Sequence, residues 1–149
     1  MNKKNFLIKK KKIISNKDGN IYKFISSDED EFNPKGEVYF SKLKTKKIKA
    51  WKYHLKQTQN LIVPVGSVKL ILIKYSKKNK KVLQKKIISL NEKNDYKLIT
   101  IMPRTWYGFK NVGKKDALIV NFTNIPHKKK EGININIDHC EFEIDWKKI

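Results

Sequence analysis

Arginine, alanine and cysteine are almost missing from this chain of 149 residues. Arg104 is the only arginine, so lysine carries nearly all of the positive charge behind the formal net charge of +21. Proteins that clamp phosphates or read bases favour the planar fork of arginine, which lysine does not imitate. We therefore interpret the excess lysine as a solvated surface and expect no nucleic-acid partner. A basic barrel that binds nucleic acid is the alternative if the lysines gather on one face.

Long apolar runs are also missing, and cysteine occurs once, as Cys140. A single cysteine excludes a disulfide within the chain and fits a reducing compartment. No stretch approaches the roughly 20 apolar residues of a membrane span. The apolar run at residues 6–8 is too short for a signal peptide. We therefore expect a cytoplasmic protein with no membrane partner.

Helical periodicity is the third absence. Apolar residues recur at the short intervals of strands, and most of them are β-branched or aromatic. No crossover helix and no Gly-rich phosphate loop is predicted, which favours an antiparallel double-sheet roll over a parallel nucleotide-binding sheet. The predicted strands cover residues 37–42, 48–54, 60–65, 68–75, 82–89, 97–102, 107–111 and 117–123.

What the chain does contain is a pair of spaced polar motifs. The first reads Lys52-x-His54, then Gln59 after four residues and Gly66 after six more. Its spacing resembles the first cupin motif, His-x-His, three or four residues, Glu, six residues, Gly. The second motif, over residues 102–111, resembles the cupin pattern Pro-x-Gly-x-x-His-x-x-x-Asn. Two such motifs in order indicate a cupin more specifically than either alone.

Within the cupins, the chain resembles the RmlC-like branch, the dTDP-4-dehydrorhamnose 3,5-epimerases. Residues 48–52, 59–62 and 101–109 are similar to that branch's Arg-Gly-Leu-His, Gln-x-Lys-Leu-Val and Ile-Pro-x-Gly-x-x-His-Gly-Phe segments. The resemblance implies an all-β cupin double-stranded β-helix, a jelly-roll barrel. It implies one domain over residues 1–149, with a barrel core at about 36–125, an N-terminal strand arm and a C-terminal closing arm. It also implies a homodimer.

The cupin metal site is the first place where the chain departs from the family. Such a site needs three or four His and carboxylate ligands that converge inside the barrel. The corresponding places hold Lys52, His54, Gln59 and Tyr107, of which only His54 is a good ligand. We expect no metal and no other cofactor.

The family's catalytic residues are also replaced. Epimerisation beside a ketone needs a base, a group that holds the enolate oxygen and an acid on the other face. In the family a histidine oriented by an aspartate, a lysine and a tyrosine supply these roles. The resemblance puts Lys52 in the histidine place, Leu70 in the aspartate place and Asn60 in the lysine place. The tyrosine place is Ile125 or Pro126.

Three interpretations of the polar residues follow. A buried lysine with a lowered pKa can act as a base or hold the enolate oxygen, and Tyr107 can then donate a proton. Lys52 and His54 can instead hold the substrate in a binding module without chemistry. Because these two residues share one face of a strand, both are ordinary surface residues if that face is exposed. The predicted catalytic residues are Lys52 and Tyr107, and the predicted substrate-binding residues are Lys49 (at the pyrophosphate), His54, Gln59 and Asn121.

These observations predict a nucleotide-sugar 3,5-epimerase-like protein. Its partner is a sugar nucleotide of the dTDP-4-keto-6-deoxyhexose type, in surface-polysaccharide synthesis of the rhamnose or O-antigen kind. A non-catalytic cupin that binds a sugar nucleotide is the alternative.

Overall fold

The computed structural model describes residues 4–139 and 141–149, so Cys140 lies outside the described residues. Within them no helix is long and apolar enough to cross a membrane. A single short 3₁₀ helix, η1 (Ile137–His139), interrupts the β-structure. The strands are β1 (Phe6–Lys10), β2 (Ile13–Ile14), β3 (Ile21–Tyr22), β4 (Glu37–Leu43), β5 (Ile48–His54), β6 (Gln59–Val65), β7 (Ser67–Ser76), β8 (Lys81–Asn91), β9 (Lys97–Ile101), β10 (Trp106–Asn111), β11 (Ala117–Thr123) and β12 (Gly132–Asn134).

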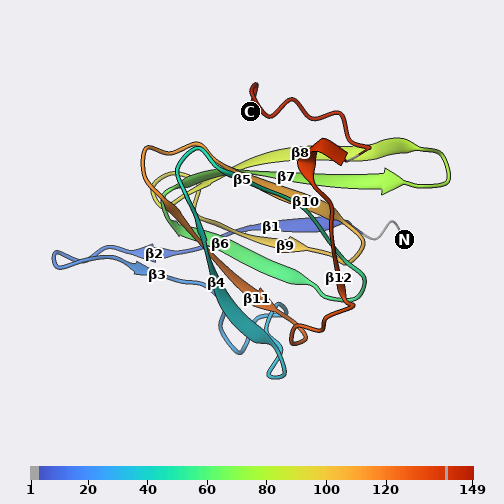
Figure 1. Cartoon of the computed structure of the whole chain (residues 1–149). Helices are drawn as coiled ribbons and strands as arrows, with labels where there is room; N and C mark the ends of the chain where they lie inside the picture. Colours follow the sequence, from blue (N-terminus) through green and yellow to red (C-terminus); the bar gives the residue numbers. More distant parts are fainter. Residues whose placement is uncertain (1–3, 140) are drawn as a thin grey trace.

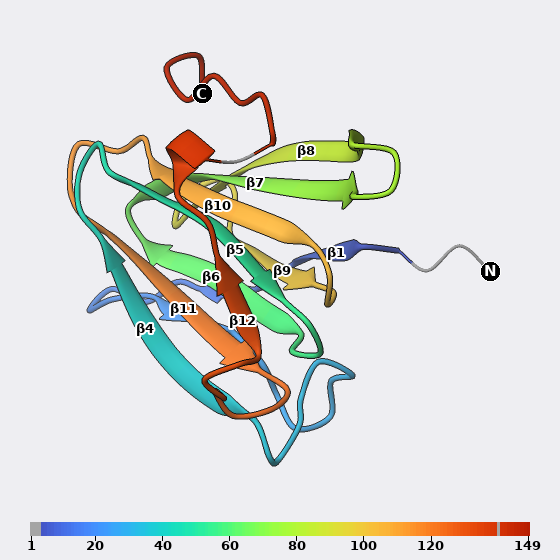
Figure 2. The same cartoon turned by 45° about the vertical axis from the view of Figure 1, so that its right-hand side comes forward.

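Two five-stranded antiparallel sheets make up the body of the molecule (Figures 1 and 2). One has the strand order β1-β9-β6-β11-β4, and the other has the order β12-β5-β10-β7-β8. A separate hairpin of β2 and β3 projects from the body. The crossovers between strands that are far apart in sequence are those of a jelly roll. The predicted all-β cupin fold is therefore confirmed, and each of the eight predicted strands is present to within two residues at either end.

Alternation along the strands separates two apolar layers. On β7, Leu70 and Leu72 point into the barrel, where they belong to a core shared by both sheets. Ile71 and Ile73 point outward and pack with Phe142 of the C-terminal segment. Because both faces of β7 are covered, its sequence reads as an almost continuous apolar run rather than an alternating one.

The interior of the barrel changes from apolar to polar along the strands. Leu61 on β6 and Ile119 on β11 are buried in the apolar core. Two residues away on the same faces, Gln59 and Asn121 are equally buried but polar, with exposed fractions of 1% and 4%. Buried polar side chains need hydrogen-bond partners, and here they find them in one another. The barrel therefore has an apolar end and a polar end, and the pocket described below lies at the polar end.

Candidate functional site

A pocket of about 470 Å³ opens at the polar end of the barrel. Lys52 and His54 reach it from β5, and Tyr39 reaches it from β4 in the opposite sheet. The face of β5 that carries Lys52 and His54 is therefore not an ordinary solvated surface. The described residues that line the pocket are Glu37, Tyr39, Lys52, His54, Gln57, His127, Lys129, Gly132 and Asn134.

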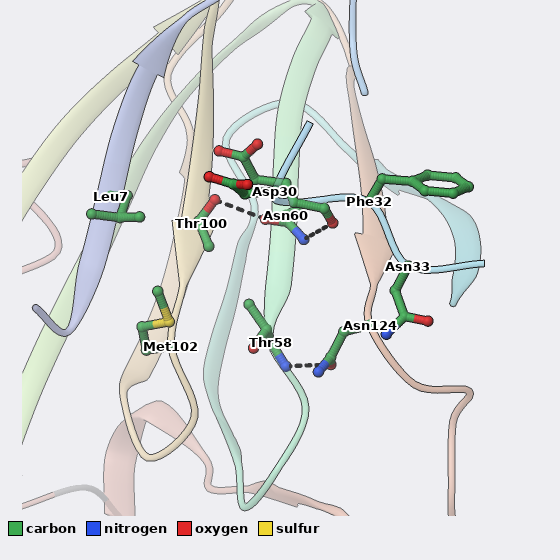
Figure 3. A pocket seen from close by; sticks show the side chains of 10 residues that line it. Leu7, Asp30, Phe32, Asn33, Thr58, Asn60, Thr100, Met102 and Asn124 are labelled. Carbon is green, nitrogen blue, oxygen red and sulfur yellow. Dashed lines mark hydrogen bonds between the residues drawn. The ribbon is translucent and has the colours of Figure 1, made fainter. Parts of the chain in front are cut away.

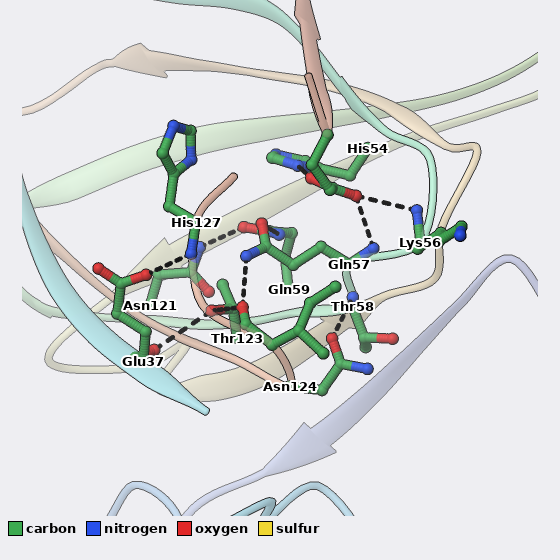
Figure 4. A network of polar contacts seen from close by, with 12 residues as sticks. Glu37, His54, Lys56, Gln57, Thr58, Gln59, Asn121, Thr123, Asn124 and His127 are labelled. Carbon is green, nitrogen blue, oxygen red and sulfur yellow. Dashed lines mark hydrogen bonds and ion pairs between the residues drawn. The ribbon is translucent and has the colours of Figure 1, made fainter. Parts of the chain in front are cut away.

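The imidazole of His54 has a partner at each ring nitrogen, and Figure 4 shows the polar network around it. Nδ1 lies 2.5 Å from Oε2 of Glu131, and Nε2 lies 3.1 Å from the hydroxyl oxygen of Tyr107. The other carboxylate oxygen of Glu131, Oε1, accepts hydrogen bonds from the backbone N–H groups of Lys56 at 2.9 Å and Gln57 at 2.7 Å. These bonds fix the orientation of the ring, as a carboxylate behind a histidine does in many active sites.

Glu131 is a charged partner for His54 at neutral pH. Burial opposes ionisation of this carboxyl group, but the hydrogen bonds from His54 and from the two backbone N–H groups outweigh it. The net effect is to lower the pKa of Glu131. No spacing signal in the sequence pointed to this residue, because it lies 77 positions after His54 in a lysine-rich loop before β12.

A network of side-chain amides and hydroxyls lies beneath the pocket. The Oε1 atom of Gln59 accepts hydrogen bonds from Asn121 Nδ2 at 2.6 Å, from the Tyr39 hydroxyl at 3.1 Å and from the Tyr107 hydroxyl at 3.4 Å. Its Nε2 atom donates to Gln57 at 2.7 Å. Such a network pins each side chain to one orientation, so the pocket is formed before any ligand arrives.

Lys52 lines this pocket and is partly buried. Burial, together with the neighbouring charge of Lys49, lowers the pKa of Lys52. Among the described residues, no carboxylate forms an ion pair with its ammonium group. Lys49 itself is exposed and does not line the pocket, since its ammonium group donates to Ser41 Oγ at 2.8 Å and to the Lys42 carbonyl at 3.1 Å.

The predicted site residues thus separate into three groups. Lys52 and His54 line the pocket. Tyr107, Gln59 and Asn121 lie behind its wall in the hydrogen-bond network, where Tyr107 is only 2% exposed. Lys49 lies outside the pocket. Sequence reasoning missed Tyr39 and Glu131.

A second hollow of about 340 Å³ lies on the outer face of the other sheet (Figure 3). Asn60, which occupies the family's lysine place, lines this hollow instead of the barrel pocket. Its side chain accepts a hydrogen bond from Thr100 at 2.7 Å. The carboxylates of Asp30 and Glu31 at the rim disfavour an anionic ligand, so we place the candidate site in the barrel pocket.

The donor set of the barrel pocket does not suit a transition-metal ion. Across residues 4–139 and 141–149, no group of three or more His, Cys, Asp or Glu side chains is arranged to hold one. His54 has both ring nitrogens engaged by protein groups. The chemistry of the pocket is therefore that of amine, imidazole, phenol and amide groups, with one carboxylate from Glu37.

Comparison with solved structures defines the class of protein. The structure is similar to a dTDP sugar isomerase from Desulfovibrio desulfuricans G20, with 28% identity, a TM-score of 0.88, and coverage of 97% of this chain and 92% of that one. It is also similar to the 3,4-ketoisomerase QdtA from Thermoanaerobacterium thermosaccharolyticum, solved as a point mutant in complex with TDP-4-keto-6-deoxyglucose. That match has 26% identity, a TM-score of 0.69, and coverage of 90% and 89%. No protein-family model and no curated sequence matches the chain.

A 3,5-epimerase of the same fold gives a third comparison. This is the dTDP-6-deoxy-D-glucose-3,5-epimerase RmlC from Legionella pneumophila Philadelphia 1, in complex with dTDP-4-keto-L-rhamnose. The identity is 15%, the TM-score is 0.78, and the match covers 98% of this chain and 80% of that one. The fold and its polar pocket define a cupin. The fold is that of an RmlC-like cupin, and the chain is similar to solved structures of sugar-nucleotide epimerases and isomerases with this fold.

Proposed function

We propose that this protein acts on a dTDP-4-keto-6-deoxyhexose as a nucleotide-sugar 3,5-epimerase-like enzyme of surface-polysaccharide synthesis in the cytoplasm. The observation that carries the proposal is the pocket itself. It presents an amine and an imidazole on one wall and a phenol on the other, in a fold shared with proteins that handle dTDP sugars. Inversion of a carbon needs proton-handling groups on opposite faces of the sugar, and two facing sheets supply them.

Charge and size support a sugar-nucleotide ligand. Lys52 and Lys129 line the pocket with a single carboxylate, that of Glu37, and the two lysines favour an anionic ligand such as a diphosphate. The amide and hydroxyl groups beside them suit the hydroxyl groups of a sugar. In this proposal Lys52 takes the proton from the carbon beside the ketone or holds the enolate oxygen. His54, Gln59 and Asn121 shape the sugar subsite, and Lys49 meets the diphosphate outside the pocket.

A second candidate is 3,4-ketoisomerase activity on the same substrate. The observation that favours it is sequence identity, which is 26% with the 3,4-ketoisomerase and 15% with the 3,5-epimerase. Both reactions include removal of the proton from C3 by a base, so the pocket chemistry proposed for Lys52 serves either. A non-catalytic cupin that binds a sugar nucleotide is the alternative to both.

Solvent-deuterium exchange tests the proposal. With dTDP-4-keto-6-deoxyglucose in D₂O, the protein should incorporate deuterium at C3 well above the buffer rate, because Lys52 removes that proton. Mass spectrometry measures the exchange, and NMR distinguishes inversion at C3 and C5 from transfer of the ketone to C3. Tight binding of dTDP in calorimetry without any exchange would select the binding module. Absence of both binding and exchange would end the proposal.

We also propose that the protein is a homodimer. β4 is an edge strand, and its outward residues Val38 and Phe40 are 53% and 66% exposed. An edge strand with exposed apolar side chains readily pairs with another chain. Light scattering should give twice the mass of the chain, and Phe40→Glu should shift the protein towards the monomer. A wild-type protein that is monomeric at micromolar concentration contradicts this assignment.

A further inference from the structure

The pocket holds a tyrosine that is better placed to meet a substrate than Tyr107. The Tyr107 hydroxyl lies 3.1 Å from Nε2 of His54, behind the pocket wall, and the residue is 2% exposed. Burial also raises the pKa of Tyr107 well above its ordinary value. Tyr39 is only half-buried and lines the pocket directly. The hydroxyl of Tyr107 is enclosed by His54 and Gln59, whereas Tyr39 itself belongs to the pocket lining.

The position of Tyr39 relative to Lys52 is the second step. β4 carries Tyr39 at the edge of one sheet, and β5 carries Lys52 in the other sheet. Both residues line the same pocket. A sugar ring between the two sheets would therefore have the amine on one side and the phenol on the other. An acid that completes an inversion must stand opposite the base in this way.

Two hydrogen bonds hold the hydroxyl group of Tyr39. Asn121 Nδ2 donates to the Tyr39 oxygen at 2.6 Å, so this oxygen is supported if it becomes a phenolate. The Tyr39 hydroxyl donates to Gln59 Oε1 at 3.1 Å, but that oxygen already accepts a shorter bond from Asn121 at 2.6 Å. Burial and the charge of Glu37 raise the pKa of Tyr39, and together they outweigh the hydrogen bond from Asn121, which lowers it. The phenol therefore carries its proton at neutral pH.

Resting on the proposed function, we propose that Tyr39 is the catalytic acid of this site and that Tyr107 is a positioning residue for His54. The neutral amine of Lys52 takes the proton from the carbon beside the ketone, and the electron pair of the broken C–H bond forms the enolate. The O–H bond of Tyr39 breaks as its proton forms a C–H bond on the opposite face of that carbon. The products are the inverted sugar, a Lys52 ammonium and a Tyr39 phenolate. Solvent at the pocket mouth then carries a proton from the ammonium to the phenolate.

Separate measurements of exchange and inversion test this assignment. In D₂O, Tyr39→Phe should keep exchange of the C3 proton, because Lys52 can return a deuteron to the face from which it removed the proton. Inversion should fall about 100-fold, which is the scale of a lost general acid. Tyr107→Phe should lower exchange and inversion together, because it disturbs His54 and not the acid. Tyr53→Phe should change neither, since that tyrosine packs on Trp106 outside the barrel, with ring centroids 4.7 Å apart.

The possible results separate this inference from the function on which it rests. Inversion that survives in Tyr39→Phe, or that is lost selectively in Tyr107→Phe, overturns the assignment of Tyr39 while the epimerase stands. Wild-type exchange with ketone transfer to C3 and no inversion also overturns it, in favour of the ketoisomerase. A wild-type protein without any exchange removes the proposed activity and the catalytic acid together.

Discussion

Lys52→Met should reduce both deuterium exchange and product formation about 1,000-fold, within the range expected for loss of a general base. Methionine keeps the length of the side chain but has no group that accepts a proton or neutralises an enolate. The fold should not suffer, because the lowered pKa of Lys52 shows that burial disfavours its charged form. We therefore expect an unfolding temperature that is unchanged or raised. Lys44→Met, at an exposed lysine between β4 and β5, is the matched control and should behave as wild type.

The pH profile gives the same prediction a second measurement. Lys52 acts as a base only in its neutral form, so the exchange rate should rise with pH through the pKa of Lys52. Burial and Lys49 place this pKa below its ordinary value, so the rate should level off at a lower pH than a solvated lysine would give. Exchange that is lost in Lys52→Met supports the assignment. Exchange that persists in Lys52→Met with an unchanged pH profile means that another group is the base.

Most of the barrel strands were predictable from the sequence because they are covered on at least one face. β6 and β11 bury most of their residues and β7 buries half of its own, and burial selects the β-branched and aromatic side chains that form the signal. β1 and β12 are absent from the list of predicted strands. β1 buries only part of one residue and carries lysines at its end, and β12 has three residues at a sheet edge. These two short edge strands lie largely in water, so their sequences carry little pattern, whereas the longer edge strands β4 and β8 were predicted.

The same contrast explains which site residues were found. His54 and Gln59 lie close together along the chain, so motif spacing could bring them to notice. Glu131 contacts His54 across 77 positions, and only the path of the chain through two sheets brings them together. Tyr39 lies within the predicted strand 37–42 and was not singled out by the sequence. Alternate residues of a strand point to the same face, so Tyr39 shares a face with Leu43, which is buried in the barrel core. This alternation was the available signal that the side chain of Tyr39 points inward.

Removal of the Glu131 side chain should have the largest effect on stability. In Glu131→Ala, the N–H groups of Lys56 and Gln57 and the Nδ1 atom of His54 all lose their acceptor. A buried donor without an acceptor costs about 1–3 kcal/mol. Because water in the pocket can reach some of these groups, we expect the free energy of unfolding to fall by about 3 kcal/mol in total. Urea unfolding followed by tryptophan fluorescence measures this, with exposed Glu143→Ala as the matched control.

The pH dependence of stability distinguishes the effect of the charge of Glu131 from the effect of its hydrogen bonds. The pKa of this carboxyl group is lower in the folded protein than in the unfolded chain, so ionised Glu131 stabilises the fold at neutral pH. That contribution is complete above the unfolded value of about 4.3 and is lost as the pH falls through the lower folded value. Glu131→Gln keeps an oxygen for the two backbone N–H groups but carries no charge. Its stability should therefore differ from that of wild type at about pH 7 and converge with it towards about pH 3. A constant difference across this range would mean that Glu131 supports the site through its hydrogen bonds alone.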